Sequence, residues 1–230
     1  AEVATLVQQA GGDATVVMQA LASHARPRRR AADRTLPAVM RRDPALYVRL
    51  HQQLSTISDA VTRVGVVSDG ADDTAAVSVQ LAAAAAEASR AVLLIDADVL
   101  RRRVASAVGQ LQRAGLAEVA RGRLELASAL VTVSTGRDNT IAFLPAGSTS
   151  TPPPLLATIA PELQRLMRRH DLAVIAMAHD ANSWPALLTP RDLVLAVTPG
   201  LTRVAWLSNA LRSATRAGQR VRGVVVLRGT

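Results

Sequence analysis

The sequence predicts an α/β fold in which a doubly wound, mostly parallel sheet is flanked by helices. From residue 63 onward, short aliphatic runs alternate with segments of helical pattern, which is typical of right-handed βαβ units. The core has to be built from Ala, Val and Leu, because 49% of the residues are apolar but only 2% are aromatic. Uninterrupted aliphatic runs are typical of strands covered on both faces of a parallel sheet. The six runs are 64–67, 91–96, 141–145, 172–177, 193–197 and 224–227.

The chain divides into two parts. Residues 1–35 form an N-terminal extension with an Arg-rich linker, and residues 36–230 form one domain. The extension is expected to be partly ordered at best. A helix is predicted over 43–57, because Asp43 is a suitable N-cap and Pro44 suits the first helical position.

The same helix carries an apolar stripe made of Leu46, Leu50 and Leu54, beside the single tyrosine of the chain, Tyr47. The stripe packs either on its own domain or on a neighbouring molecule.

Two later helices are predicted between the aliphatic runs. Residues 161–170 begin with proline, and residues 201–218 end at Gly218, a plausible helix C-cap. Residues 147–154 are rich in Pro and Ser and are predicted to be a surface loop. The apolar face of the 201–218 helix consists of Leu201, Val204, Leu207, Leu211 and Ala214.

The charge of the chain is strongly basic, with a net charge of +9, and all 27 basic residues are arginine. Such a balance favours anionic partners, which include membrane headgroups, nucleic acid and acidic proteins. The chain has no cysteine, which excludes a disulfide framework and thiolate chemistry. Its four histidines show no ligand spacing, so no metal site is expected, and no apolar run is long enough to span a membrane.

The turn after the first aliphatic run occupies the place of a phosphate-binding loop. Such a loop, GxxxxGK[ST], supplies backbone N–H groups, a lysine for the phosphates and a hydroxyl for Mg²⁺. Alignment on the helix that follows places Gly70 in the loop, Asp73 at the second glycine, Thr74 at the lysine and Ala75 at the hydroxyl. We therefore expect no nucleotide cofactor at this loop.

The charge of the loop points the same way. Asp69, Asp72 and Asp73 would face the negative charges of a triphosphate. Like charges a few ångströms apart repel by several kcal/mol at an effective dielectric near 20, roughly 4 kcal/mol at 4 Å. The chain has no lysine to neutralise them, so an arginine would have to reach in from another element.

The second aliphatic run ends in two carboxylates, Asp96 and Asp98. In a phosphoryl-transfer site, such carboxylates hold Mg²⁺ or orient the nucleophile. The alternative is that Asp98 caps a helix or pairs with Arg101 or Arg102.

The segment around these carboxylates, residues 92–109, resembles the second Walker-type motif of the bacterial tyrosine kinases. These are the cytoplasmic domains of polysaccharide co-polymerases, and they belong to a P-loop group that includes MinD and ParA. The resemblance covers about residues 36–229 and implies a P-loop NTPase-like fold. The other segments that follow in family order are 115–130, 141–157, 170–178 and 192–229.

The sequence departs from the pattern of this family at its ligand-facing positions. The third motif ends in Ala176 where the family has an aspartate, and Arg228 stands where it has a base-reading asparagine. In the first helix, Ala45, Val48 and His51 replace a charged assembly motif. The tyrosine-rich tail of the family is absent from this sequence. The resemblance therefore implies a pseudokinase, a non-enzyme with no metal site.

Two function classes follow from the resemblance. The first is a non-catalytic scaffold or regulator at the cytoplasmic face of the plasma membrane, in envelope polysaccharide or glycolipid assembly. Its partners would be proteins of that complex, integral membrane proteins among them, and further copies of the chain. The second is a MinD/ParA-like positioning protein for a pilus or septum, which binds anionic membrane or, less favoured, nucleic acid. A third alternative is an enzyme that uses Asp96 and Asp98 with an arginine clamp.

Overall fold

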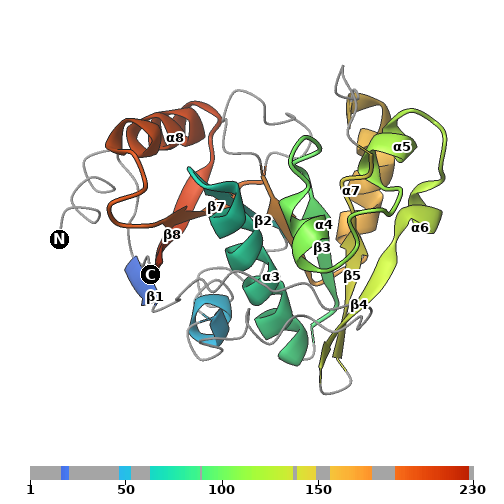
Figure 1. The fold of residues 1–230 in the computed structure, drawn as a ribbon, viewed down its shortest axis with the longest axis horizontal. Helices are drawn as coiled ribbons and strands as arrows, with labels where there is room; N and C mark the ends of the chain where they lie inside the picture. The colour runs from blue at the N-terminus through green and yellow to red at the C-terminus, as the bar shows by residue number, and fades with distance from the viewer. Residues whose placement is uncertain are drawn as a thin grey trace.

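The computed structural model describes residues 17–20, 47–52, 63–88, 90–136, 139–148, 156–177 and 190–227. Eight strands form one sheet in the order β1-β8-β7-β2-β6-β3-β5-β4, and all neighbours are parallel except the β4–β5 pair (Figure 1). The strands are β1 (Val17–Ala20), β2 (Arg63–Ser68), β3 (Val92–Asp96), β4 (Val131–Gly136), β5 (Asn139–Leu144), β6 (Leu172–Ala176), β7 (Asp192–Val197) and β8 (Arg220–Leu227). The predicted doubly wound α/β fold is confirmed.

The helices fall into a long central one, two medium ones and several short ones. They are α3 (Ala71–Glu87), α4 (Arg103–Ala107), α5 (Leu116–Ala120), α6 (Leu126–Ala129), α7 (Ala160–Arg168) and α8 (Val204–Arg216), with the 3₁₀ turn η2 (Leu156–Ile159) before α7. Residues 47–52 are also helical. No helix in the described part of the chain is long and apolar enough to cross a membrane.

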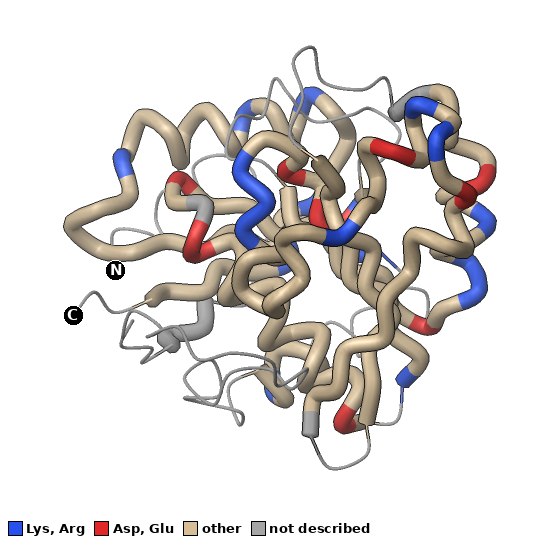
Figure 2. Tube along the Cα trace, turned by 45° about the vertical axis from the view of Figure 1, so that its right-hand side comes forward, with Lys and Arg blue, Asp and Glu red and all other residues tan. Residues whose placement is uncertain are grey.

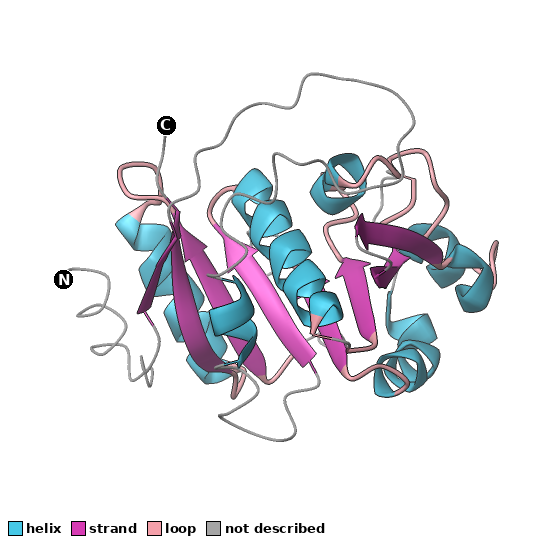
Figure 3. Ribbon diagram, turned by 90° about the horizontal axis from the view of Figure 1, so that it is seen from below, coloured by secondary structure: helices cyan, strands magenta, loops and turns pink. Residues whose placement is uncertain are grey.

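Helices cover both faces of the sheet and so create two cores (Figure 3). On one face, α3, α4 and Tyr47 and Leu50 of the first helix pack on strand residues such as Val66 and Leu94. On the other face, α5, α7 and α8 pack on the alternate strand residues, such as Val67 and Ile95. This alternation follows from the period of two along a strand, and it explains why the central strands are aliphatic throughout.

The Ala-rich sequence of α3 suits its place across the middle of the sheet. Its buried side chains include Ala82, Ala85 and Val79, all fully buried. Small side chains allow the helix backbone to lie close to several strands at once, and alanine has the highest helix propensity.

The predicted elements are largely confirmed, with two additional strands. All six aliphatic runs form strands, and the predicted helices correspond to residues 47–52, α7 and α8. The structure adds β4, and also β1, which lies within the predicted N-terminal extension and pairs with β8. The proposed boundary at residues 35 and 36 stays a prediction. Asp43, Pro44, Leu46 and Leu54 lie outside the described residues.

One detail of the α8 prediction is wrong. The helix begins at Val204, and Leu201 and Val204 are 74% and 62% exposed instead of joining the buried face. Leu201 belongs to the turn that precedes the helix, so helical periodicity does not apply to it. Leu207, Leu211 and Ala214 are buried as predicted, and Gly218 follows the helix with a φ of 67°.

Candidate functional site

The candidate site lies where the carboxyl ends of β2, β3, β6 and β7 meet. Ligands of open parallel sheets bind at this edge. β2 ends at Ser68, Asp69 and Gly70 form a bend, and α3 begins at Ala71. Gly70 has an extended backbone with φ −102° and ψ 125°, and none of residues 69–75 has a positive φ. The bend therefore lacks the alternation of right- and left-handed residues that forms an anion-binding nest.

Asp69 forms an ion pair with an arginine from another element. Arg203, the residue before α8, donates to Asp69 from its Nε at 2.9 Å and from a terminal nitrogen at 2.6 Å, and its backbone N–H adds a third bond at 3.0 Å. The Asp69 side chain is 9% exposed. These hydrogen bonds and the charge of Asp69 raise the pKa of Arg203. The two-point geometry is the one that guanidinium and carboxylate groups favour.

The other two carboxylates of the loop are also paired within the chain. Asp73 accepts a hydrogen bond of 2.8 Å from the hydroxyl of Thr198, which follows β7. Asp72 forms an exposed ion pair of 3.2 Å with Arg103, the first residue of α4. Each of the three aspartates thus binds a group of a neighbouring element.

The two remaining loop positions point into the protein. The Thr74 hydroxyl lies 2.8 Å from the hydroxyl of Ser68, and both side chains are buried. The Ser68 hydroxyl also donates to the carbonyl of Gly70. Ala75 packs in the core under the sheet. Neither position presents a cation or a free hydroxyl to the edge of the sheet.

Asp96 is the most deeply buried carboxylate of the site. One of its oxygens accepts a 2.9 Å hydrogen bond from the N–H of Ala105, and the other has no partner. Burial raises the pKa of Asp96 to about 7; the hydrogen bond from Ala105 opposes this shift, and the charge of Asp98 adds to it. Burying a carboxylate with one unpaired oxygen costs free energy, and binding a proton relieves that cost.

The alternative that Asp98 caps a helix is wrong for α4, whose N-cap is Arg102; Asp98 instead binds the backbone of the turn before that helix. Its side chain accepts a hydrogen bond of 3.1 Å from the N–H of Arg101, and its carbonyl accepts one of 2.8 Å from Arg102. Arg102 has a φ of 52° and directly precedes α4. Asp98 therefore fixes the turn that leads from β3 into α4.

The third-motif position, Ala176, is buried and lies beside Asp96 on β3 and Val66 on β2. Arg228 lies outside the described residues. In the described part of the chain, no group of three histidine, aspartate or glutamate side chains is placed to hold a metal ion.

Of the first-helix positions, Val48 packs partly against the core, and His51 is buried. Burial, and then the charge of Arg90, lower the pKa of His51. The apolar stripe of this helix thus packs on its own domain at Tyr47 and Leu50. Ala45 lies outside the described residues.

Sequence reasoning missed Arg203 and Thr198. Both residues follow β7, whose carboxyl end lies beside that of β2. Strand order, which brings β7 next to β2, was needed to connect them with the loop.

Comparison with known proteins identifies the fold. No family model and no curated protein matches the sequence. Among solved structures, the chain is similar to the kinase domain of Escherichia coli tyrosine kinase ETK, with a TM-score of 0.77, 18% identity and coverage of 98% of this chain and 93% of that chain. The chain has the fold of bacterial tyrosine kinase domains.

Other structures share this tyrosine kinase fold. The chimerical protein CapA2B2 has a TM-score of 0.76 and 15% identity, and the match covers 97% of each chain. The septum site-determining protein MinD of Pyrococcus horikoshii OT3, complexed with Mg-ADP, has a TM-score of 0.57 and 20% identity, over 71% of this chain and 69% of that chain. At these identities the likeness concerns the fold alone.

Proposed function

We propose that the chain is a non-catalytic domain of tyrosine kinase fold that acts as a scaffold or regulator at the cytoplasmic face of the membrane. Its process would be the assembly or export of envelope polysaccharide or glycolipid, with proteins of that complex as partners. The observation that carries the proposal is the internal pairing of Asp69, Asp72 and Asp73 at the place of a phosphate loop.

Charge and geometry support the absence of ordinary nucleotide binding. A phosphate placed 4 Å from one carboxylate of the loop is repelled by roughly 4 kcal/mol at an effective dielectric of 20. Arg203 and Arg103, which lie within ion-pair distance of the loop, already bind its aspartates. The extended backbone at Gly70 supplies no nest of N–H groups in compensation.

Isothermal titration with Mg-ATP and with Mg-ADP tests the proposal. We expect no saturable heat up to millimolar nucleotide, while MinD of Pyrococcus horikoshii, whose structure contains Mg-ADP, serves as the positive control. A melting curve gives a second readout, because a ligand at a hundredfold excess over its Kd stabilises a protein by about 2.7 kcal/mol. Micromolar binding in either experiment would contradict the proposal.

The second candidate is a positioning protein that binds anionic membrane or nucleic acid. The likeness to MinD and the net charge of +9 favour it. Figure 2 shows that the arginines of the described residues are spread over many elements and interleaved with acids, which supports the scaffold more than a single basic face.

Vesicle sedimentation and a DNA gel shift separate the two candidates. A positioning protein held by charge should lose affinity steeply between 50 and 200 mM salt, roughly 10³-fold or more for six or more phosphate contacts. A scaffold that binds proteins should show little binding to either probe at any of these salt concentrations.

A further inference from the structure

The strand β4 forms one end of the sheet and leaves an edge open. Its strand neighbour is β5, and in the described part of the chain no strand pairs with its other side. An unpaired strand edge presents a row of N–H and C=O groups that can pair with another segment.

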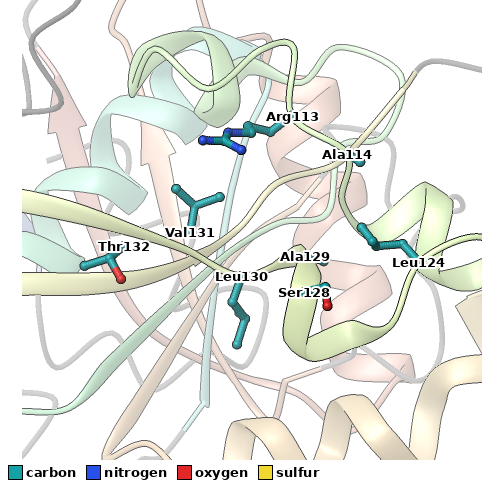
Figure 4. Close-up of a pocket in the computed structure, with 8 residues that line it drawn as sticks. All are labelled: Arg113, Ala114, Leu124, Ser128, Ala129, Leu130, Val131 and Thr132. Atoms are coloured by element: carbon teal, nitrogen blue, oxygen red, sulfur yellow. The ribbon is translucent and has the colours of Figure 1, made fainter.

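A hollow of about 510 Å³ lies at the beginning of this strand, between β4, α6 and the loop before α5 (Figure 4). This is within the range of about 300–1,000 Å³ that is usual for binding sites. The half-buried side chains of Leu124 and Leu130 supply apolar surface, and the exposed Ser128 and Thr132 supply hydroxyl groups. The hollow can therefore take an apolar side chain next to the open strand edge.

Arg113 is the cation of this hollow. Its side chain is exposed, and Figure 4 shows it reaching from its loop toward Val131 of β4. No carboxylate of the described residues lies within ion-pair distance of Arg113, whereas Arg103, Arg123 and Arg203 each bind one. The hollow thus has a positive charge that a carboxylate would complement.

We propose that the hollow binds an extended, acidic segment of a partner protein, which adds its backbone to the open edge of β4 and places a carboxylate on Arg113. Strand addition is an established mode of peptide recognition, in which main-chain hydrogen bonds give affinity and adjacent pockets give specificity. The partner segment would supply one apolar side chain to the wall formed by Leu124 and Leu130.

A second copy of the chain fits this edge less well. The strand β4 carries no carboxylate, so a second copy paired along β4 would not supply from that strand the acidic group that complements Arg113. The site is separated from the loop after β2 by β6, β3 and β5, and its test is independent of nucleotide binding.

The test starts from a displayed library of short random peptides, selected on the full chain. The strongest peptide and its analogue with every acidic side chain replaced by the amide are then titrated by fluorescence anisotropy. We expect the analogue and Arg113→Gln each to weaken the Kd about tenfold, and their combination to weaken it no further, as required of one ion pair. Arg216→Gln, the same charge change at the last turn of α8, should leave the Kd unchanged.

Hydrogen exchange then locates the peptide. Added protection of the amides of residues 131–135 supports strand addition. The proposal is overturned if no peptide depends on Arg113, if the enriched peptides lack acidic residues, or if the protection lies elsewhere. It is also overturned if the free chain sediments as a dimer in which β4 is already protected, because the edge is then paired with a second copy.

Discussion

Asp96→Asn should make the stability of the protein less sensitive to a rise in pH from about 4 to about 7. The wild-type carboxyl keeps its proton in the folded state up to about pH 7, while in the unfolded state it ionises near its ordinary value of 3.8. Between these values the folded state binds more protons, so the stability of the wild type falls as the pH rises. Each pKa unit corresponds to about 1.4 kcal/mol, and the full loss is therefore about 4 kcal/mol.

The measurement compares the free energies of unfolding of the variant and the wild type at several pH values. We expect their difference to grow by about 4 kcal/mol in favour of the variant from pH 4 to pH 8. The readout is the growth of this difference with pH, because the constant cost of burying the new amide and the groups that do not interact with Asp96 drop out of it. Asp72→Asn, at an exposed carboxylate of the same edge, should run parallel to the wild type within about 0.5 kcal/mol. If the free energies of unfolding of Asp96→Asn and the wild type changed in parallel with pH, burial would not raise the pKa of Asp96 as described.

Gly115→Ala should destabilise the fold by about 3 kcal/mol, because it overpacks a backbone contact. An added Cβ would lie 2.1 Å from the carbonyl oxygen of Pro145 and 2.9 Å from the nitrogen of Gly147. These are backbone atoms, which cannot rotate away as a side chain can. The same backbone accepts the first hydrogen bonds of α5, from Leu116 to Pro145 at 2.8 Å and from Ala117 to Ala146 at 3.0 Å.

A thermal melt measures this effect, which should lower the Tm by roughly 6–12 °C for a chain of this size. Gly70→Ala is the matched control. At Gly70 a Cβ would meet only the Asp73 carboxylate, at 3.3 Å, and the backbone is extended. Its expected effect is within about 1 kcal/mol, because Gly70 is the N-cap of α3, where alanine is somewhat less favourable than glycine. If Gly115→Ala had the same Tm as the wild type, the backbone at residues 145–147 would be able to move away from the added Cβ without loss of stability.

The central strands of the sheet could be predicted from the sequence, but the strands at its two edges could not. Strands such as β3 and β6 are buried on both faces and therefore read as unbroken aliphatic runs. In β4, Thr132 and Ser134 alternate with Val131 and Val133, a pattern typical of a strand with one face toward solvent. β1 exists as a strand through its pairing with β8, which lies about two hundred residues later, and a local pattern does not contain such a contact.

For the candidate site, the sequence predicted positions but not partners. The ends of aliphatic strands located the loop at 69–75 and the carboxylates Asp96 and Asp98, but Asp98 binds the backbone of the turn before α4 instead of capping that helix. The ion pair between Arg203 and Asp69 depends on β7 lying next to β2 and on the length of the arginine side chain. Both are tertiary properties, so spacing along the chain does not reveal them.

The ion pair between Asp69 and Arg203 also bears on how long the domain can stay in one conformation. In nucleotide-driven switch proteins, hydrolysis limits how long the active conformation lasts, because the switch segments are held by a phosphate that is later cleaved and released. Here the turn after β7 is held to the loop after β2 by side chains of the chain itself, and these never leave. On the proposed function, no phosphate release would open this contact. The domain would then act for as long as its partners stay bound.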